Sequence, residues 1–349
     1  MGVESYMPNV LVDTDGLTEE EWLEYRRQGI GGSDAAAILG VSPFATARDL
    51  YYDKCKIVSY ADEESNWVGK RIGHLLEDLV AEIFSKKTGF PVYKIHKMFR
   101  HPRYGFMLAD IDYFVTLPHG ETALLEIKTT NYNAKDHWWK DGKETVPINY
   151  EAQGRHYMCV MNANHIYYCC LYGNSENDVI IRHLERDRAY EEELISLEGH
   201  FWNHHVLTKT PPPYTEDGEL VLESVMHHVG PADPNAPQVE LDLPLASCVV
   251  RFTELQAQKR LADEQSKSIE NEMKRLQGRI VAEMGVSCTA VCAVGADAYT
   301  VTYNPTRKAG VSKENLARLQ AQHPDIYEEY VTVSESRRFY VKRSQQAAA

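Results

Sequence analysis

Two short stretches of sequence, Leu108-Ala-Asp-Ile-Asp112 and Leu125-Glu-Ile-Lys128, decide the fold of this chain. They lie in two runs of apolar and β-branched residues, 106–117 and 122–130, and the intervening Pro118-His-Gly120 is typical of a turn. Two such runs on either side of a turn predict a β-hairpin.

The predicted hairpin gathers charged side chains on its strand faces. Side chains alternate between the two faces of a strand, so Glu126 and Lys128 point the same way, and Asp110 and Asp112 share a face of the first strand. If helices cover both sides of the sheet, these groups need partners, and a divalent cation is a suitable one. The alternative is an exposed strand on which Glu126 and Lys128 form an ordinary surface ion pair.

Helical and strand patterns alternate around the hairpin, as expected for an α/β (α+β) fold in which helices flank a central mixed sheet. Thr18-Glu-Glu-Glu21 is a capping box that starts the first helix. Helices are predicted over 18–28, 35–39, 65–87, 147–161 and 187–206, strands over 165–172 and 178–184, and an irregular segment over 1–18.

A glycine-rich stretch, Gly29-Ile-Gly-Gly-Ser33-Asp34, precedes the second predicted helix. Glycines before a capped helix let the backbone approach an anion, and Arg26 and Arg27 lie just upstream. The pattern indicates a phosphate pocket. A plain turn with Ser33 as the N-cap explains it equally well.

Two further helices carry polar candidates. Glu77 lies beside the apolar stripe of the helix over 65–87, where it can point into a cleft or form a surface salt bridge. Gln153 and Tyr157 are one turn apart on the helix over 147–161 and could hold a nucleotide. A half-buried amphipathic helix would show the same spacing.

Composition bounds the class of protein. The 349 residues are 43% hydrophobic and 25% charged, which are globular values. No apolar run approaches a membrane span, the start of the chain lacks a secretory pattern, and seven cysteines without a Cys-x-x-Cys motif fit a reducing cytoplasm. The net charge of -14 argues against non-specific coating of nucleic acid, although the local field of a cleft can differ.

The composition changes at Thr210-Pro-Pro-Pro-Tyr214. We therefore predict a first domain over 1–209, an extended proline-rich linker over 210–244, and a helical and small α+β appendage over 245–349. The appendage should contain a long helix over 245–284 with a heptad-like apolar seam, packed as a hairpin or a coiled coil. Its later elements are a strand over 298–303, a helix over 312–321 and a strand over 337–342.

Six motifs occur in a fixed order along the first domain. They are Trp22-x-x-x-Arg26, Ile30-Gly-Gly-Ser33-Asp-Ala-Ala-Ala-Ile-Leu-Gly, Gly73-x-x-x-Glu77, Ala109-Asp-Ile-Asp112, Leu125-Glu-Ile-Lys128 and Tyr150-x-x-Gln153-x-x-x-Tyr157. Together they resemble the YqaJ viral recombinase family, which includes the lambda exonucleases, over roughly residues 20–206.

The resemblance implies a restriction-endonuclease-like PD-(D/E)xK core and 5′-to-3′ degradation of one strand of linear double-stranded DNA from its ends. It also implies Mg²⁺, with Mn²⁺ as a substitute and two ions per site. We further expect a ring-shaped homo-oligomer, because a coiled segment and a narrow cleft suit the tracking of a DNA strand. Such an enzyme would work beside a single-strand annealing protein in phage-type homologous recombination, in the cytoplasm of a bacterial host and encoded by a phage or prophage. A DNA endonuclease on the same fold and a catalytically silent DNA-end-binding scaffold remain alternatives.

The resemblance also assigns roles at the metal site. The implied metal ligands are Asp112, Glu126, the main-chain carbonyl of Ile127 and Glu77. Lys128 would be the catalytic lysine, and burial beside metal should lower its pKa. Asp110 remains a rival of Asp112, because Tyr113 stands where family members often have glycine.

The other carried-over roles concern the DNA. Gln153 matches the glutamine of the last motif and is expected to take part in catalysis. Arg26 and Ser33 match the pocket for the 5′-phosphate of a DNA end. Tyr157 and Arg27 are further candidates for the site.

Overall fold

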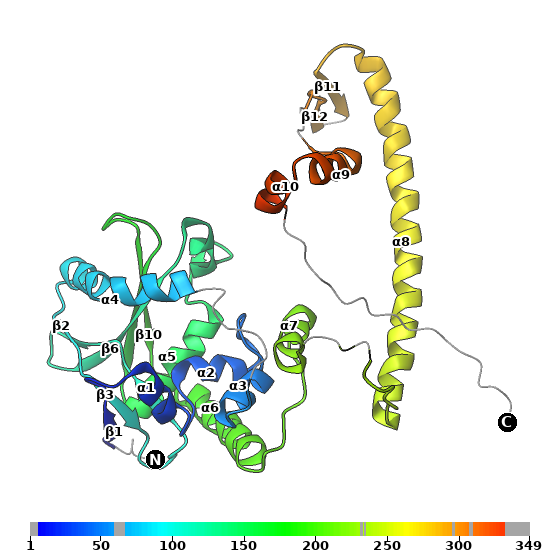
Figure 1. Cartoon of the computed structure of the whole chain (residues 1–349). Helices are drawn as coiled ribbons and strands as arrows, with labels where there is room; N and C mark the ends of the chain where they lie inside the picture. Colours follow the sequence, from blue (N-terminus) through cyan, green and yellow to red (C-terminus); the bar gives the residue numbers. More distant parts are fainter. Residues whose placement is uncertain are drawn as a thin grey trace. The chain divides into compact units, whose positions relative to one another are not determined.

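The computed structural model describes residues 6–58, 67–230, 233, 235–294, 297–306 and 310–331, and the chain divides into two compact units, Met1–Pro234 and Asn235–Ala349 (Figure 1). The predicted helix start at residue 65 and the predicted strand over 337–342 lie outside the described residues. In the described part of the chain, no helix combines the length and the apolar character that a membrane span requires.

In the described part of the first unit, a mixed sheet of five strands has the order β10-β9-β6-β5-β2. The strands are β2 (Val92–Tyr93), β5 (Tyr113–Thr116), β6 (Thr122–Thr129), β9 (His165–Leu171) and β10 (Val179–Glu185). β6 and β9 are parallel, and the other neighbouring pairs are antiparallel. A parallel pair needs a crossover connection, and helix α5 (Ile148–Met161) lies within it.

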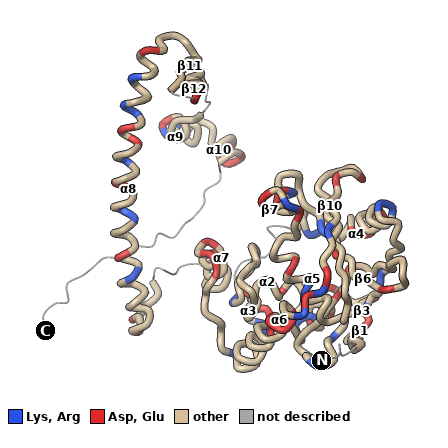
Figure 2. The backbone as a smooth tube through the Cα atoms, turned by 180° about the vertical axis from the view of Figure 1, so that it is seen from behind, with Lys and Arg blue, Asp and Glu red and all other residues tan. Residues whose placement is uncertain are grey.

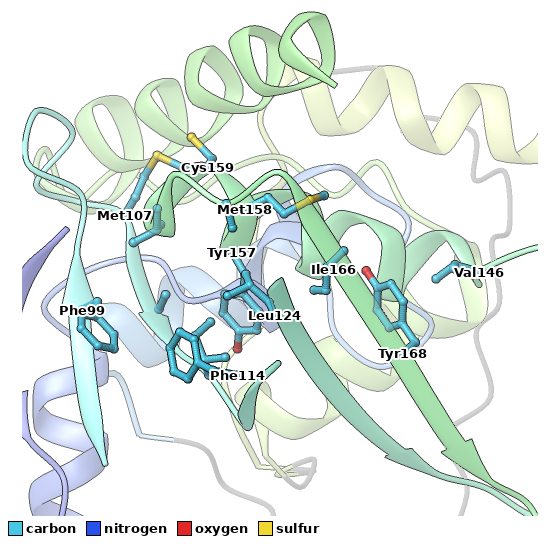
Figure 3. Packing of buried hydrophobic residues seen from close by; sticks show 14 of the residues in the cluster. Phe99, Met107, Phe114, Leu124, Val146, Tyr157, Met158, Cys159, Ile166 and Tyr168 are labelled. Carbon is cyan, nitrogen blue, oxygen red and sulfur yellow. The ribbon is translucent and has the colours of Figure 1, made fainter. Parts of the chain in front are cut away.

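Helices cover both faces of this sheet (Figure 1). Helix α4 (Trp67–Thr88) packs Val80 and Phe84 on one face, against Leu125 and Ile127. On the opposite face α5 packs Tyr157 and its neighbours against Leu124, Phe114 and Ile166 (Figure 3). The alternation of β6 between the two clusters follows from its period of two, and the predicted mixed sheet between helices is confirmed.

Further α-helices of the first unit lie before and after these elements in the sequence. They are α1 (Glu19–Arg26), α2 (Gly32–Ile38), α3 (Ala47–Lys54) and α6 (Arg188–Phe201), which continues into a π-helical turn over Trp202–Val206. The capping box predicted for the first helix is present at Thr18 and Glu21. Helix α3 was not predicted, although Thr46 and Asp49 form a capping box at its start.

The first strand of the predicted hairpin is two strands. β4 (Leu108–Asp110) joins a separate antiparallel sheet with β3 (Lys97–Arg100) and β1 (Asn9–Asp13), and only β5 pairs with β6. Ile111 and Asp112 lie between the two sheets. The prediction that Asp110 and Asp112 share a strand face is therefore wrong, as is the prediction that residues 1–18 are irregular.

The segment 210–244 is not an extended linker throughout. It contains helix α7 (Gly218–Val229), whose Ser224 is buried and donates a hydrogen bond to Asp49 Oδ1 at 2.5 Å. Tyr214 stacks under Arg48, with the guanidinium carbon 4.4 Å from the ring centroid. Flanking prolines masked the helical periodicity of α7, and the first unit extends past the predicted boundary at residue 209 to Pro234.

The second unit begins with a long helix, α8 (Leu243–Met284), as predicted. It is followed by the antiparallel hairpin of β11 (Thr289–Val294) and β12 (Asp297–Thr302), then by α9 (Lys313–Gln322) and α10 (Pro324–Tyr330). β11 and α10 were not predicted. Basic and acidic residues alternate along α8 (Figure 2), and its apolar seam is exposed, with Ile269 at 61%. Packing of this seam in a hairpin or coiled coil stays a prediction.

Candidate functional site

Most of the predicted site residues line one cleft, with a cavity volume of about 440 Å³. They come from the α1–α2 region, α4, the β4–β5 connection, β6 and α5. The cleft is lined by Arg26, Ser33, Glu77, Asp110, Asp112, Glu126, Gln153 and Tyr157. Lys128 lines a neighbouring cavity of about 940 Å³, and Glu77 borders both.

Two carboxylates, the half-buried Asp112 and the buried Glu126, form the centre of the cleft. Asp112 Oδ2 accepts a hydrogen bond from the Ile127 main-chain N–H at 2.8 Å, and Glu126 is 3% exposed. Burial raises the pKa of Asp112 well above its usual range, and the charge of Glu126 raises it further. Burial also raises the pKa of Glu126, although Lys128 acts in the opposite direction. The pair therefore carries unfavourable negative charge that a bound cation would relieve, and two carboxylates are suitable ligands for Mg²⁺.

Lys128 lies on the same strand face as Glu126, as the alternation of β6 predicted. Its Nζ is 2.7 Å from Glu126 Oε1 and 3.1 Å from Gln153 Oε1, while Gln153 Nε2 donates to Glu126 Oε1 at 2.5 Å. Burial alone would lower the pKa of Lys128, but Glu126 and Asp112 outweigh it, so the pKa is raised. Two acids beside the amine cause this rise, and the lowering expected for Lys128 beside a bound metal stays a prediction.

Glu77 reaches the cleft from α4 but has other partners. Its carboxylate is 3.1 Å from His74 Nδ1 and 3.2 Å from Lys94 Nζ. Among the described residues, no group of three or more His, Cys, Asp or Glu side chains stands close enough together to hold a metal ion. The fold brings Asp112 and Glu126 together. That Glu77 joins them as a metal ligand, and that the site binds a second metal ion, stay predictions.

The rival aspartates occupy different places. Asp110, at the end of β4, accepts a hydrogen bond from Trp22 Nε1 at 2.7 Å, whereas Asp112 interacts electrostatically with Glu126. Burial raises the pKa of Asp110 as well, with Trp22 opposing the shift. The geometry favours Asp112 as the partner of Glu126, because the strand break turns Asp112 toward β6.

The predicted phosphate pocket forms around the start of α2. Arg26 Nη2 donates to Ser33 Oγ at 2.7 Å, and the same guanidinium pairs with Asp34. Ser33 is not the N-cap, since α2 begins at Gly32 with Gly31 as its cap. A Cβ at Gly32 would lie 2.5 Å from Tyr157 Cε1, so only glycine allows α2 and α5 to approach this closely.

The two further candidates differ. Tyr157 lines the cleft, and its hydroxyl is 3.4 Å from Gln153 Nε2. Arg27 does not line it: Arg27 Nε pairs with Asp53 at 2.9 Å, and its Nη1 lies 3.3 Å from Glu24. Successive residues at the end of α1 point about 100° apart, which separates Arg27 from Arg26.

Sequence reasoning missed several residues around the site. Trp22 belongs to the motif Trp22-x-x-x-Arg26, and Asp34 directly follows Ser33, but no function was predicted for either side chain. His74, Lys94 and Lys54 are not part of any sequence pattern that indicates a site. Their roles depend on contacts between residues distant in sequence, such as Lys94 with Glu77 and Lys54 with Asp34. A capping box at Thr46 was the local signal for the helix that carries Lys54.

Comparison with known proteins adds the following. A family model described as a YqaJ-like viral recombinase domain matches residues 21–164. A curated relative from Bacillus subtilis, the uncharacterized protein YqaJ, is 31% identical over 337 residues, which are 95% of this chain and 97% of the relative.

Solved structures are similar at lower identity. An alkaline exonuclease from Laribacter hongkongensis is 19% identical with a TM-score of 0.44, and the match covers 55% of this chain and 94% of that one. A phage related exonuclease from Haemophilus somnus 129PT is 12% identical with a TM-score of 0.37, over 52% of this chain and 96% of that one.

Proposed function

The chain belongs to the YqaJ-like viral recombinase family, and from this premise we propose that it is a metal-dependent deoxyribonuclease of the PD-(D/E)xK type. The proposed activity is 5′-to-3′ degradation of one strand of linear double-stranded DNA, starting at its ends. The observation that carries the proposal is the group formed by the buried Glu126 and the half-buried Asp112 and Lys128, placed in and beside a cleft that Arg26 also lines.

The proposed metal ligands are Asp112, Glu126, the main-chain carbonyl of Ile127 and Glu77. The neighbouring carboxylates of Asp112 and Glu126 fit this role, because oxygen ligands suit Mg²⁺ and a cation offsets their repulsion. Mn²⁺ should substitute, and we expect two ions per site. Bound metal would activate water and offset the negative charge of the scissile phosphate.

The protein's own groups position the reacting atoms. Lys128 Nζ, held between Glu126 and Gln153, is placed to donate to the scissile phosphate or the attacking water. Gln153 bonds both of its neighbours and so fixes the distance between the acid and the amine. Its contact with the Tyr157 hydroxyl continues this network toward Gly32, at the start of α2.

Recognition of the DNA end is assigned to Arg26 and Ser33. A guanidinium beside a hydroxyl, in front of the glycine-rich start of a helix, suits a terminal phosphate dianion. A grip on the terminal phosphate would set the register for stepwise removal of nucleotides. An enzyme that cuts within DNA has no need of such a grip.

Purified protein with Mg²⁺ should digest linear 5′-phosphorylated duplex DNA and leave a supercoiled circle intact. The measurement is gel analysis of both substrates in the same reaction, with EDTA as the control. Nicking of the circle would favour the endonuclease alternative. Binding of DNA ends with no cleavage in Mg²⁺ or Mn²⁺ would favour a catalytically silent scaffold.

We also propose that the enzyme forms a ring-shaped homo-oligomer and works with a single-strand annealing protein in the bacterial cytoplasm. The exposed seam of α8 supports a role for the second unit in assembly or in recruitment of that partner. A chain truncated after residue 209 would not distinguish assembly from recruitment, because the truncation removes α7 and its buried contacts with α3.

A chain truncated after Gly230 should keep the stability of the first unit, whereas one truncated after Lys209 should lose about 1–3 kcal/mol. The loss follows from removing the partners of Asp49 Oδ1, which accepts from Ser224 and lies 3.1 Å from His228 Nε2. Urea unfolding measures the difference. Equal stability of the two truncated chains would contradict the packing role of α7.

The chain that ends at Gly230 also tests the role of the second unit. If this chain keeps the oligomeric state and activity of the full chain, the second unit serves recruitment. If it becomes monomeric, the second unit builds the subunit interface.

A further inference from the structure

Three charged side chains form a line that starts at the cleft and runs into the protein. Arg26 pairs with Asp34 Oδ1, and Lys54 Nζ lies 2.7 Å from the other oxygen, Asp34 Oδ2. Their side chains are 26%, 5% and 0% exposed, in that order. Of these three, Arg26 is the one that lines the cleft, so DNA would meet it and not the other two.

Lys54 and Asp34, the two inner residues of this line, also contact the main chain. Lys54 is the last residue of α3, and its Nζ also lies 3.3 Å from the Arg26 main-chain oxygen. Asp34 accepts a hydrogen bond from the Gly31 N–H at 2.9 Å. Burial opposes ionisation of Asp34, but Arg26 and Lys54 outweigh it and lower its pKa to about 2. Asp34 is therefore a fixed negative charge directly behind the proposed phosphate-binding guanidinium.

A carboxylate in that position would weaken a phosphate site if it stood alone. Arg26 and Asp34 together have no net charge, and the carboxylate competes with a phosphate for the same N–H donors. Lys54 changes this balance, because it takes the second oxygen of Asp34 and supplies a second positive charge. The three groups together keep one positive charge, and of the three it is Arg26 that lines the cleft.

The surrounding ion pairs leave this balance intact. Asp53 lies 3.8 Å from Lys54 Nζ, but it is paired with Arg27 at 2.9 Å. Glu24 is shared between Arg27 and Lys56. Among the described residues that these ion pairs join, four are basic and three are acidic, so the wider network also keeps one positive charge.

We propose that Lys54 is a positioning residue for recognition of the DNA end: it neutralises Asp34 from behind, so that Arg26 keeps its positive charge for the terminal 5′-phosphate. This inference rests on the proposed function, since it assumes that Arg26 meets that phosphate. A buried ion triad that only stabilises the fold would affect DNA with and without the phosphate equally.

The test compares 5′-phosphorylated and 5′-hydroxyl ends of one duplex. The phosphate preference is the ratio of kcat/KM for the 5′-phosphorylated duplex to kcat/KM for the 5′-hydroxyl duplex. Lys54→Met keeps the length of the side chain and removes its charge, and it should lower this ratio by about tenfold. The double variant Asp34→Asn with Lys54→Met restores the charge balance and should recover most of the ratio. Lys86→Met is the control, an exposed lysine on α4 that pairs with Glu82 outside this network and whose loss should not change the ratio.

Binding of the same two duplexes, measured by fluorescence anisotropy in EDTA, separates the inference from the proposed activity. Phosphate preference that depends on Lys54 without any cleavage by the wild type would contradict the nuclease and support the inference. Cleavage with a ratio that Lys54→Met leaves unchanged would overturn the inference alone. A wild type that cleaves DNA with no phosphate preference would overturn both the inference and the proposed role of Arg26 and Ser33 at the DNA end. A ratio that falls in Lys54→Met and stays low in the double variant would overturn the charge argument in favour of simple packing. Urea unfolding of each variant identifies any loss of the fold.

Discussion

Lys128→Ala is expected to reduce DNA cleavage by about a hundred- to a thousandfold while the protein still binds DNA ends. The Nζ group of Lys128 is fixed by Glu126 at 2.7 Å and by Gln153 at 3.1 Å, so no neighbouring side chain replaces it once it is removed. Single-turnover digestion of a 5′-phosphorylated linear duplex measures the chemical step, and anisotropy with the same duplex measures binding.

Removal of the amine also leaves Glu126 buried without its cation, which is costly for stability. Lys128→Gln is therefore the companion variant, because its amide still donates a hydrogen bond to Glu126 while it lacks the charge. Lys143→Ala, at an exposed position on β8 (Lys143–Glu144), controls for the loss of a lysine. Turnover at the wild-type rate by a folded Lys128→Ala protein would remove Lys128 from the mechanism.

Asp112→Asn is expected to abolish Mg²⁺-dependent cleavage and, in the absence of metal, to raise the melting temperature. Asp112 is half-buried beside Glu126, and a neutral amide in its place removes the repulsion between the two carboxylates. A gain of about 1 kcal/mol corresponds to a rise of about 2–4 °C for a domain of this size. Thermal unfolding with and without Mg²⁺ measures it.

The same experiment decides between the two aspartates. Mg²⁺ should stabilise the wild type, because a ligand that binds the folded state alone raises its stability, and it should stabilise Asp112→Asn much less. Asp110→Asn should keep the Mg²⁺ effect, since Asp110 is bonded to Trp22 and is not the partner of Glu126. The reverse result would make Asp110 the ligand. An Mg²⁺ effect that neither variant reduces would place the metal elsewhere.

The local part of the fold could be predicted from the sequence. The capping box at Thr18, the long helix α8 and the strands β9 and β10 follow from patterns within single segments. The sharing of one face by Glu126 and Lys128 follows from the two-residue period of a strand. The order of the motifs indicated the family, and the similarity to the Bacillus subtilis relative over nearly the whole chain supports it.

The break between β4 and β5 could not be predicted in this way. The residues 106–117 look like one strand because their apolar character is continuous, yet Leu108–Asp110 pairs with β3 and Tyr113–Thr116 pairs with β6. The choice depends on partners elsewhere in the chain, whose hydrogen bonds compete for the same backbone. That choice places Asp112 beside Ile127 and Asp110 beside Trp22.

By itself, the sequence determined the acid and the amine of β6, the start of α1 at its capping box, and the family. Tertiary structure alone decided which aspartate joins Glu126, that α7 packs on α3, and that Lys54 stands behind Asp34. The physical reason is range: side-chain alternation and capping act over a few residues, so one segment is enough to reveal them. Charge balance and strand pairing depend on groups brought together only when the whole first unit packs.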